Sequence, residues 1–280
     1  CRYHCLDQAE AEDLTQETFL RFMENIASYQ HIGKAKNYLY VIAGNLYRAW
    51  MIPKMGYYSR HPEKYSERFR YEYDRYAINL MKKTGRITTE GFGMENLPKD
   101  GGYVMFSNHQ GKYDALGIMH THDTPCSVVM DDARSHGPLV KQFIDLVEGK
   151  RLKLDNLKQA AGIIKEVTEE VKKGRKFIIF PSGGYEHRNG NYVDEFKPGA
   201  FKSAMRAKAP IVPVAIVDSW KVFDLWSLRK VKTEVFYLKP MFYDEYKDKK
   251  SVEISSIVYN RICSAVDFAQ KGEFDKALLQ

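Results

Sequence analysis

The feature that most constrains the fold is an alternation of short apolar runs with amphipathic runs from Ile87 onward. Apolar segments typical of strands cover residues 103–107, 127–130, 177–180, 211–217 and 233–238. Amphipathic segments typical of helices cover residues 157–173, 201–208 and 252–269. This alternation predicts an α/β fold with a largely parallel central sheet flanked by helices.

The first fifty residues have a different, all-helical pattern. Leu14, Thr18 and Phe22 recur at helical spacing behind acidic residues that suit a helix N-terminus. Pro53 and Gly56 then interrupt the pattern. We therefore predict three parts: a small helical segment over residues 1–50, a linker with an amphipathic helix over 51–86, and the α/β domain over 87–280.

That amphipathic helix, over residues 63–84, has an aromatic face and a charged remainder. Such a helix either covers the core of the domain or lies on a membrane surface, and both alternatives stay open. The chain has no apolar run of the roughly 18 residues needed to span a bilayer. It begins at Cys1 without a signal-peptide pattern, so we expect a fragment of a longer reading frame that stays in the cytosol.

Charge and cysteine content narrow the classes of function. The net charge is +7, and residues beyond 50 carry 38 basic against 30 acidic side chains. A basic body suits an anionic partner such as a phosphate, a lipid surface or nucleic acid. The four cysteines are scattered and form no metal-type pair or disulfide framework, so we expect reduced thiols and no metal.

The candidate chemistry lies directly after the strand predicted at residues 103–107. His109 follows that strand, and Asp114 comes five residues later. In α/β sheets, reactive side chains gather where strands end. A neutral histidine can take a proton from a hydroxyl, and an aspartate can orient its ring. Because no serine or cysteine nucleophile accompanies the pair, the attacking group would be the substrate's own hydroxyl.

Several ordered blocks resemble the lysophosphatidic acid acyltransferase family over roughly residues 57–245. The first has the family's Asn-His-x4-Asp pattern and reads Phe106-Ser107-Asn108-His109-Gln110-Gly111-Lys112-Tyr113-Asp114-Ala115. The second, Phe180-Pro181-Ser182-Gly183-Gly184, resembles the Phe-Pro-Glu-Gly block. Lys197-Pro198-Gly199-Ala200 and Pro210-Ile211-Val212-Pro213-Val214 resemble the segments that follow it.

This resemblance implies transfer of a fatty acyl group from acyl-CoA or acyl-carrier protein to the hydroxyl of lysophosphatidic acid, which gives phosphatidic acid. It makes His109 the general base and Asp114 its orienting partner. A thioester donor is already activated, so no cofactor or metal is expected. Backbone N–H groups near Gly183 and Gly184 are one source of oxyanion donors; the alternative is a plain strand-to-loop turn.

The acceptor-binding residues are expected around the same blocks. We expect substrate binding at Asn108, Lys112, Arg151, Ser182, Gly183, Gly184 and Arg188, with the basic side chains chosen because a phosphate requires fixed positive charge. Lys150 and Lys153 are further cations near the expected phosphate site. Two positions depart from the family: Ser182 replaces a glutamate, and Tyr185 stands near where many members have arginine. The departures leave open a different acceptor, such as glycerol-3-phosphate or another lysophospholipid.

Residues 5–50 resemble part of region 2 of an RNA polymerase sigma factor of the extracytoplasmic-function type. The first matching run is Ala11-Glu12-Asp13-Leu14-Thr15-Gln16-Glu17-Thr18-Phe19-Leu20-Arg21, and the second is Lys36-Asn37-Tyr38-Leu39-Tyr40-Val41-Ile42-Ala43-Gly44-Asn45-Leu46. The resemblance stops there, and the segment is weakly acidic. Since phosphate contacts supply most nucleic-acid affinity, we do not expect nucleic acid or RNA polymerase as partners.

Three alternatives therefore accompany the acyltransferase interpretation: the same fold with another acceptor, a transcription protein acting through residues 1–50, and an acyltransferase fold without catalysis. We expect a bacterial phospholipid-biosynthesis enzyme at the inner face of the cell membrane. Peripheral attachment would use the basic and aromatic surface near residues 57–83.

Overall fold

The computed structural model describes residues 8–24, 50–137, 139–185, 190–224 and 230–280 of the chain. It divides into two compact units, Cys1–Lys64 and Tyr65–Gln280. In the described residues, no helix combines the length and apolarity needed to cross a membrane.

The described part of the first unit is helical. Helix α1 spans Gln8–Glu24, and Arg21 pairs with Glu17 one turn earlier. A second helix covers residues 50–60 and contains Pro53 and Gly56, where the sequence predicted an interruption. The helical run predicted around Leu39 lies outside the described residues.

The second unit is built on a seven-stranded sheet in the order β1-β7-β6-β2-β5-β3-β4. The strands are β1 (Ile87–Phe92), β2 (Val104–Ser107), β3 (Ser127–Asp131), β4 (Lys150–Leu152), β5 (Phe177–Ile179), β6 (Ile211–Val217) and β7 (Val231–Tyr237). Every neighbouring pair is parallel except β6 and β7. The predicted largely parallel sheet is confirmed, and the carboxyl ends of β2 to β6 meet at one edge.

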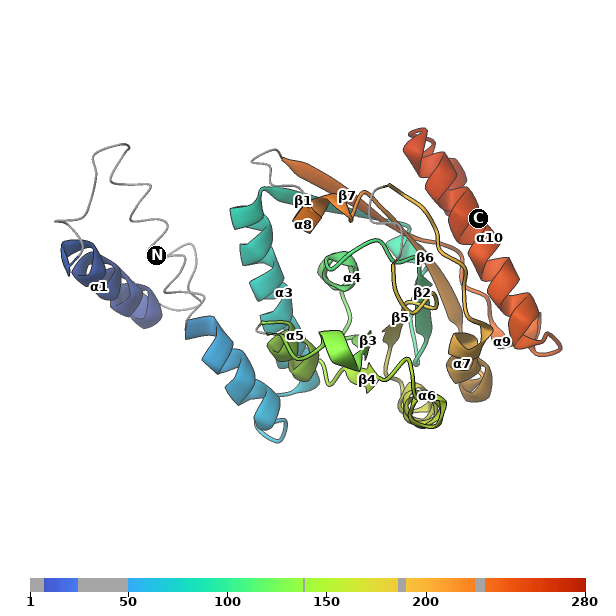
Figure 1. Cartoon of the computed structure of the whole chain (residues 1–280), viewed down its shortest axis with the longest axis horizontal. Helices are drawn as coiled ribbons and strands as arrows, with labels where there is room; N and C mark the ends of the chain where they lie inside the picture. The colour runs from blue at the N-terminus through green and yellow to red at the C-terminus, as the bar shows by residue number, and fades with distance from the viewer. Residues whose placement is uncertain (1–7, 25–49, 138, 186–189, 225–229) are drawn as a thin grey trace. The chain divides into compact units, whose positions relative to one another are not determined.

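Helices cover both faces of this sheet (Figure 1). One face carries α3 (Glu67–Gly85), α4 (Asp114–Thr121) and α5 (Val140–Leu146), and α10 (Ser251–Gln270) lies on the other. That second face also has α6 (Leu157–Lys172), α7 (Lys202–Ala207) and α11 (Phe274–Leu278). Strand residues alternate between the layers: Phe106 faces α10's side, whereas Tyr103 bonds His122, which follows α4.

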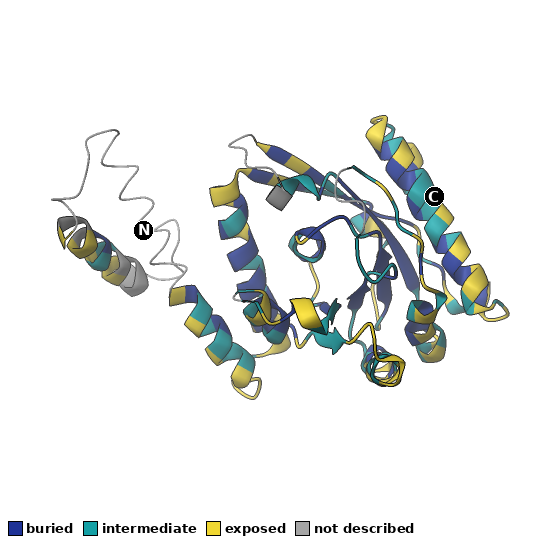
Figure 2. Cartoon of the chain, in the orientation of Figure 1, coloured by how far each residue is buried: buried dark blue, intermediate teal, exposed yellow. Residues whose placement is uncertain are grey.

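The longer covering helices α3, α6 and α10 each bury one stripe and expose the opposite side (Figure 2). On α10 the stripe comprises Ile254, Val258, Ile262 and Ala265, at the three- and four-residue spacing of one helical face. Burying such a stripe contributes roughly 1.5–3 kcal/mol for each large apolar side chain. The helix predicted at residues 252–269 is therefore confirmed, and so are those predicted at 157–173 and 201–208.

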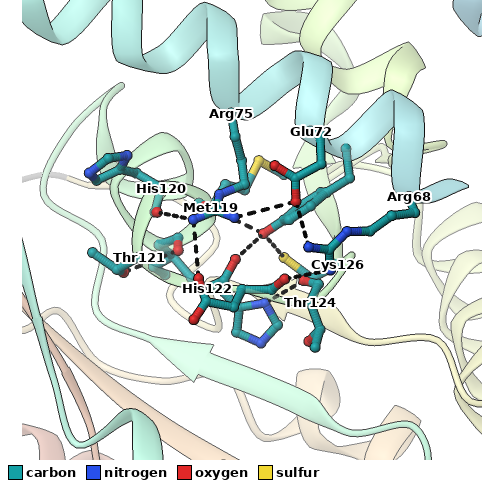
Figure 3. A network of polar contacts seen from close by, with 12 residues as sticks. Arg68, Glu72, Arg75, Met119, His120, Thr121, His122, Thr124 and Cys126 are labelled. Atoms are coloured by element: carbon teal, nitrogen blue, oxygen red, sulfur yellow. Dashed lines mark hydrogen bonds and ion pairs between the residues drawn. The ribbon is translucent and has the colours of Figure 1, made fainter.

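Helix α3 covers the core. Ser66 caps its start by accepting from the Phe69 amide at 3.2 Å. Its Tyr71 is buried and donates to the carbonyl of Met119, 3.1 Å away. Arg75 donates to the carbonyl of His120 at 3.1 Å, within a network that fixes α3 to the end of α4 (Figure 3). The exposed side of α3 keeps Arg68, Glu72 and the ring of Phe69.

Candidate active site

The site begins where β2 leaves the sheet. At that point the side chain of Asn108 replaces the backbone as a partner for β6: its amide donates to the carbonyl of Ile216 at 2.9 Å, and its carbonyl accepts from the Ile216 N–H at 2.8 Å. The Ile216 carbonyl also accepts from the side-chain amide of Gln110 at 2.9 Å, so two residues of the loop bond the same backbone group of β6. Asn108 is fully buried, so its role is to shape the loop, although we expected it to bind substrate.

His109 and Asp114 are in direct contact, as their spacing predicted. The histidine Nδ1 lies 2.6 Å from Asp114 Oδ2. Asp114 is completely buried, whereas the His109 side chain is 20% exposed. Because Nδ1 faces the carboxylate, the neutral ring carries its proton there and leaves Nε2 as the basic nitrogen.

Four donors surround the Asp114 carboxylate. Besides His109, Oδ2 accepts from the backbone N–H groups of Gln110 at 2.5 Å and Gly111 at 2.9 Å, and Oδ1 accepts from Ser219 Oγ at 2.5 Å. Asp114 also opens α4, where the helix dipole favours a negative charge. These interactions offset the cost of burying the carboxylate.

A second set of hydrogen bonds ties this loop to the segments after β5 and β6. The buried Gln110 amide donates to Asn191 at 3.0 Å and accepts from the Ser219 N–H at 3.0 Å. Asn191 in turn accepts from the Asp218 N–H and donates to its carboxylate. The sequence analysis did not single out Asn191, Asp218 or Ser219.

Tyr113 anchors the same loop to the opposite end of the sheet. Its ring is fully buried, and its hydroxyl lies 2.7 Å from the hydroxyl of Thr89 on β1. Burial raises the pKa of Tyr113 to about 12, so the phenol stays protonated and available as a donor. The position of Asp114 is therefore fixed from both sides.

Two rings enclose the imidazole. Phe180, directly after β5, stacks on His109 with centroids 4.3 Å apart and planes 22° apart. Tyr185 meets the imidazole nearly at right angles, with centroids 4.7 Å apart. The geometry fixes the ring plane of a half-buried base at the carboxyl edge of a parallel sheet, where α/β folds bind their ligands.

This arrangement sits within a recognised domain. Residues 89–217 match the family model described as Acyltransferase. Those residues are an acyltransferase domain. Residues 1–50 match a second model, Sigma-70 region 2, as their sequence indicated.

Relatives of the acyltransferase domain carry a common name. The 1-acyl-sn-glycerol-3-phosphate acyltransferase of Saccharomyces cerevisiae is 28% identical over 142 residues, which is 50% of this chain and 46% of that protein. The Escherichia coli protein of the same name is 26% identical over 181 residues, 64% of this chain and 71% of that protein. The chain spans about half the length of several curated relatives that it matches.

The fold is also that of a solved structure. The crystal structure of the 1-acyl-sn-glycerophosphate (LPA) acyltransferase, PlsC, from Thermotoga maritima superposes with a TM-score of 0.57. It covers 80% of this chain and 98% of that chain at 19% identity. At this identity the likeness shows the fold.

The second signature block of the acyltransferase domain forms a tight turn. The Gly183 N–H donates to the carbonyl of Phe180 at 3.1 Å, and Ser182 Oγ donates to the carbonyl of Gly184 at 2.7 Å. Gly183 has φ +78°, which favours glycine. Gly183 therefore forms a plain strand-to-loop turn, and its N–H is already hydrogen-bonded. The Gly184 N–H remains a predicted oxyanion donor.

The cations predicted for the acceptor lie in different surroundings. Arg151 on β4 donates to Asp145 at 2.6 Å and to Ser135 at 2.9 Å, so much of its guanidinium is engaged within the protein. Lys150 pairs with Glu170 at 2.5 Å. Lys112 and Lys153 are exposed, and Arg188 lies outside the described residues.

Proposed function

We propose that this chain transfers a fatty acyl group from acyl-CoA or acyl-carrier protein to the free hydroxyl of 1-acylglycerol-3-phosphate, giving phosphatidic acid. The contact between His109 Nδ1 and the buried Asp114 carboxylate carries the proposal, because it orients a partly exposed imidazole with Nε2 as the base. The names of the relatives support 1-acylglycerol-3-phosphate as the acceptor.

In the proposed reaction, His109 Nε2 takes the proton of the acceptor hydroxyl while the oxygen attacks the thioester carbonyl carbon. The resulting tetrahedral oxyanion collapses, the carbon–sulfur bond breaks, and the imidazolium returns its proton to the departing thiolate. Asp114 stabilises the imidazolium throughout. No covalent enzyme intermediate is needed, since the donor is an activated ester.

A thiol-release assay tests this proposal on the purified chain with acyl-CoA and with acyl-carrier protein. Lysophosphatidic acid is compared with glycerol-3-phosphate and lysophosphatidylethanolamine. We expect release with lysophosphatidic acid, and a loss of about 10²–10⁴-fold in kcat/KM for His109→Ala, since general-base catalysis contributes about that much. His61→Ala, at an exposed histidine paired with Glu63, is the matched control.

The other outcomes separate the alternatives. Thiol release with glycerol-3-phosphate or lysophosphatidylethanolamine, but not with lysophosphatidic acid, would support acyl transfer to a different acceptor. An acyltransferase fold without catalysis would release no thiol with any acceptor.

We place the chain at the cytoplasmic face of the membrane as a peripheral protein. The exposed side of α3, with Arg68 and the 41% exposed Phe69, supports attachment through the surface near residues 57–83. Sedimentation with vesicles containing anionic lipid should weaken as salt rises if charge dominates. Salt-independent sedimentation would indicate apolar insertion instead.

A second candidate function rests on the Sigma-70 region 2 match of residues 1–50. Contact with RNA polymerase would link the acyltransferase domain to transcription. A gel-shift experiment with promoter DNA and core polymerase tests it, and the absence of any polymerase contact would exclude this candidate.

A further inference from the structure

The acyltransferase domain lacks an arginine at the position of Tyr185, where the resembled family often has one. Tyr185 instead presents its ring edge-on to His109, 4.7 Å between centroids. A cation for an anionic acceptor must therefore come from another part of the chain.

Arg134 brings a cation to that ring. It ends the short helix Asp132–Arg134 that follows β3, at the same sheet edge as His109. Its guanidinium carbon lies 5.4 Å from the centroid of the Tyr185 ring, within the range of a cation–π contact. The Arg134 side chain is 55% exposed. This contact places the guanidinium on the Tyr185 ring, and that ring in turn contacts the imidazole of His109.

Most of the Arg134 guanidinium remains available to a ligand. Its Nε lies 3.6 Å from Asp131 Oδ2, a long ion pair, and Asp131 also accepts from the Ala133 N–H. Within the described part of the chain, the two terminal nitrogens have no protein acceptor. Two parallel N–H donors are what a phosphate or carboxylate binds best.

Lys197 supplies a second positive charge beside the turn of residues 181–184. Its backbone N–H donates to the Pro181 carbonyl at 3.0 Å. Its Nζ approaches Gly183 so closely that a Cβ there would lie 2.9 Å from it. Glycine at this position therefore leaves room for the ammonium beside the turn.

The turn of residues 181–184 itself carries no carboxylate side chain. Ser182 stands where the resembled family has glutamate, and its hydroxyl donates to the Gly184 carbonyl at 2.7 Å. Of the other cations predicted for the acceptor, Arg151 is engaged with Asp145 and Lys150 with Glu170. Lys112 and Lys153 are exposed, and Arg188 lies outside the described residues. Arg134, on the ring of Tyr185, and Lys197, beside Gly183, are cations that lie against the segment 183–185, whose Tyr185 contacts His109.

We propose that Arg134, held on the ring of Tyr185, forms with Lys197 a binding site for the anionic headgroup of the acyl acceptor. The inference rests on the proposed acyl transfer for the identity of the acceptor. The anion would lie beside the turn of residues 181–184, and the acceptor hydroxyl would point to His109 Nε2.

The decisive measurement compares two acceptors, lysophosphatidic acid and the uncharged 1-acylglycerol. Arg134→Gln should lower the ratio of their kcat/KM values by about tenfold, the effect of losing about 1.4 kcal/mol of headgroup binding. Lys197→Gln should lower the same ratio. Tyr185→Leu should lower it too, whereas Tyr185→Phe keeps the ring and should keep the ratio within about twofold.

Arg206→Gln is the matched control, because Arg206 is exposed on α7 and its loss changes the net charge equally. An unchanged ratio in Arg134→Gln, or an equal fall in Arg206→Gln, would overturn the inference.

Calorimetric titration with glycerol-3-phosphate gives a readout that needs no turnover. Binding that weakens about tenfold in Arg134→Gln, and not in Arg206→Gln, supports the anion site even if no acceptor is acylated, in which case the proposed function alone fails. Acylation of lysophosphatidic acid with no effect of Arg134→Gln on either measurement would overturn the inference and leave the proposed function standing.

Discussion

Asp114 is the residue on which the most interactions of the site converge. Its carboxylate is fully buried and accepts from a histidine, two backbone amides and a serine hydroxyl. A buried carboxylate is tolerated when its oxygens are hydrogen-bonded in this way. Because the two amides belong to Gln110 and Gly111, the same carboxylate also shapes the loop that carries His109.

Asp114→Asn should lower kcat by about 10²–10⁴-fold. An asparagine amide can donate to Nδ1, which moves the imidazole proton to Nε2 and removes the base. Steady-state thiol release measures the effect, and circular dichroism checks the fold. Asp248→Asn, at an exposed aspartate, is the control. An Asp114→Asn variant with native activity would contradict the assigned role.

His122 predicts how stability depends on pH. Burial lowers its pKa from 6.5 to about 4, with its Nδ1 bonded to the Thr124 carbonyl and its Nε2 to Tyr103. The unfolded chain therefore binds more protons between those pH values, and stability falls as pH drops from about 6.5 toward 4.

We expect this residue to cost about 2 kcal/mol of unfolding free energy between pH 7 and pH 5. Urea unfolding at both pH values measures it. His122→Gln keeps the hydrogen-bonding capacity but does not titrate. The free energy of unfolding that this variant loses between pH 7 and pH 5 should therefore be smaller by about 2 kcal/mol. Equal losses in the two proteins would show that His122 does not titrate on unfolding.

At the scale of elements, the start of β2 depends on a close approach to the end of α6. Gly102 precedes β2, and a Cβ there would contact the Val171 carbonyl and lie 2.6 Å from the Arg175 carbonyl. Backbone atoms cannot yield as a flexible side chain can. Only glycine lets β2, which leads into the loop of His109, lie this near to the end of α6.

Gly102→Ala should therefore lower the free energy of unfolding by about 1–3 kcal/mol or more. Gly162→Ala is the matched substitution, because Gly162 is an exposed position inside α6 with nothing within 4 Å of its added Cβ. Alanine favours helix there, so that variant should gain about 0.5–1 kcal/mol. Urea unfolding of both variants tests the pair, and a neutral Gly102→Ala would refute the proposed close approach.

At the scale of the whole molecule, the residues of the candidate site all belong to the second compact unit, Tyr65–Gln280. Residues 1–50 belong to the first unit and match a different family. We therefore expect removal of residues 1–50 to leave kcat/KM for acyl transfer within about twofold, because the residues of the candidate site and their core lie in the second unit. A loss above tenfold, with an unchanged circular dichroism spectrum, would show that the first unit contributes to catalysis.

The sequence by itself determined the class of fold and the centre of the site. The apolar strands and amphipathic helices predicted the layered sheet because burial periodicity is a local property of the chain. The contact between His109 and Asp114 was also predictable, because two residues five positions apart in one loop lie close together. Residues 50–60 are helical although Pro53 and Gly56 suggested an interruption there, and the linker over 51–86 stays a prediction.

Only the tertiary structure decided which distant residues complete the site. Ser219 lies 105 residues from Asp114, and Arg134 and Tyr185 come from loops after different strands. The rule that strand ends converge could have drawn attention to Asp218 and Ser219, which directly follow β6. The same rule could not predict that Arg151 pairs with Asp145 and that Arg134 lies on the ring of Tyr185. The partners of a side chain depend on strand order and on the path of the loops, which no local sequence pattern encodes.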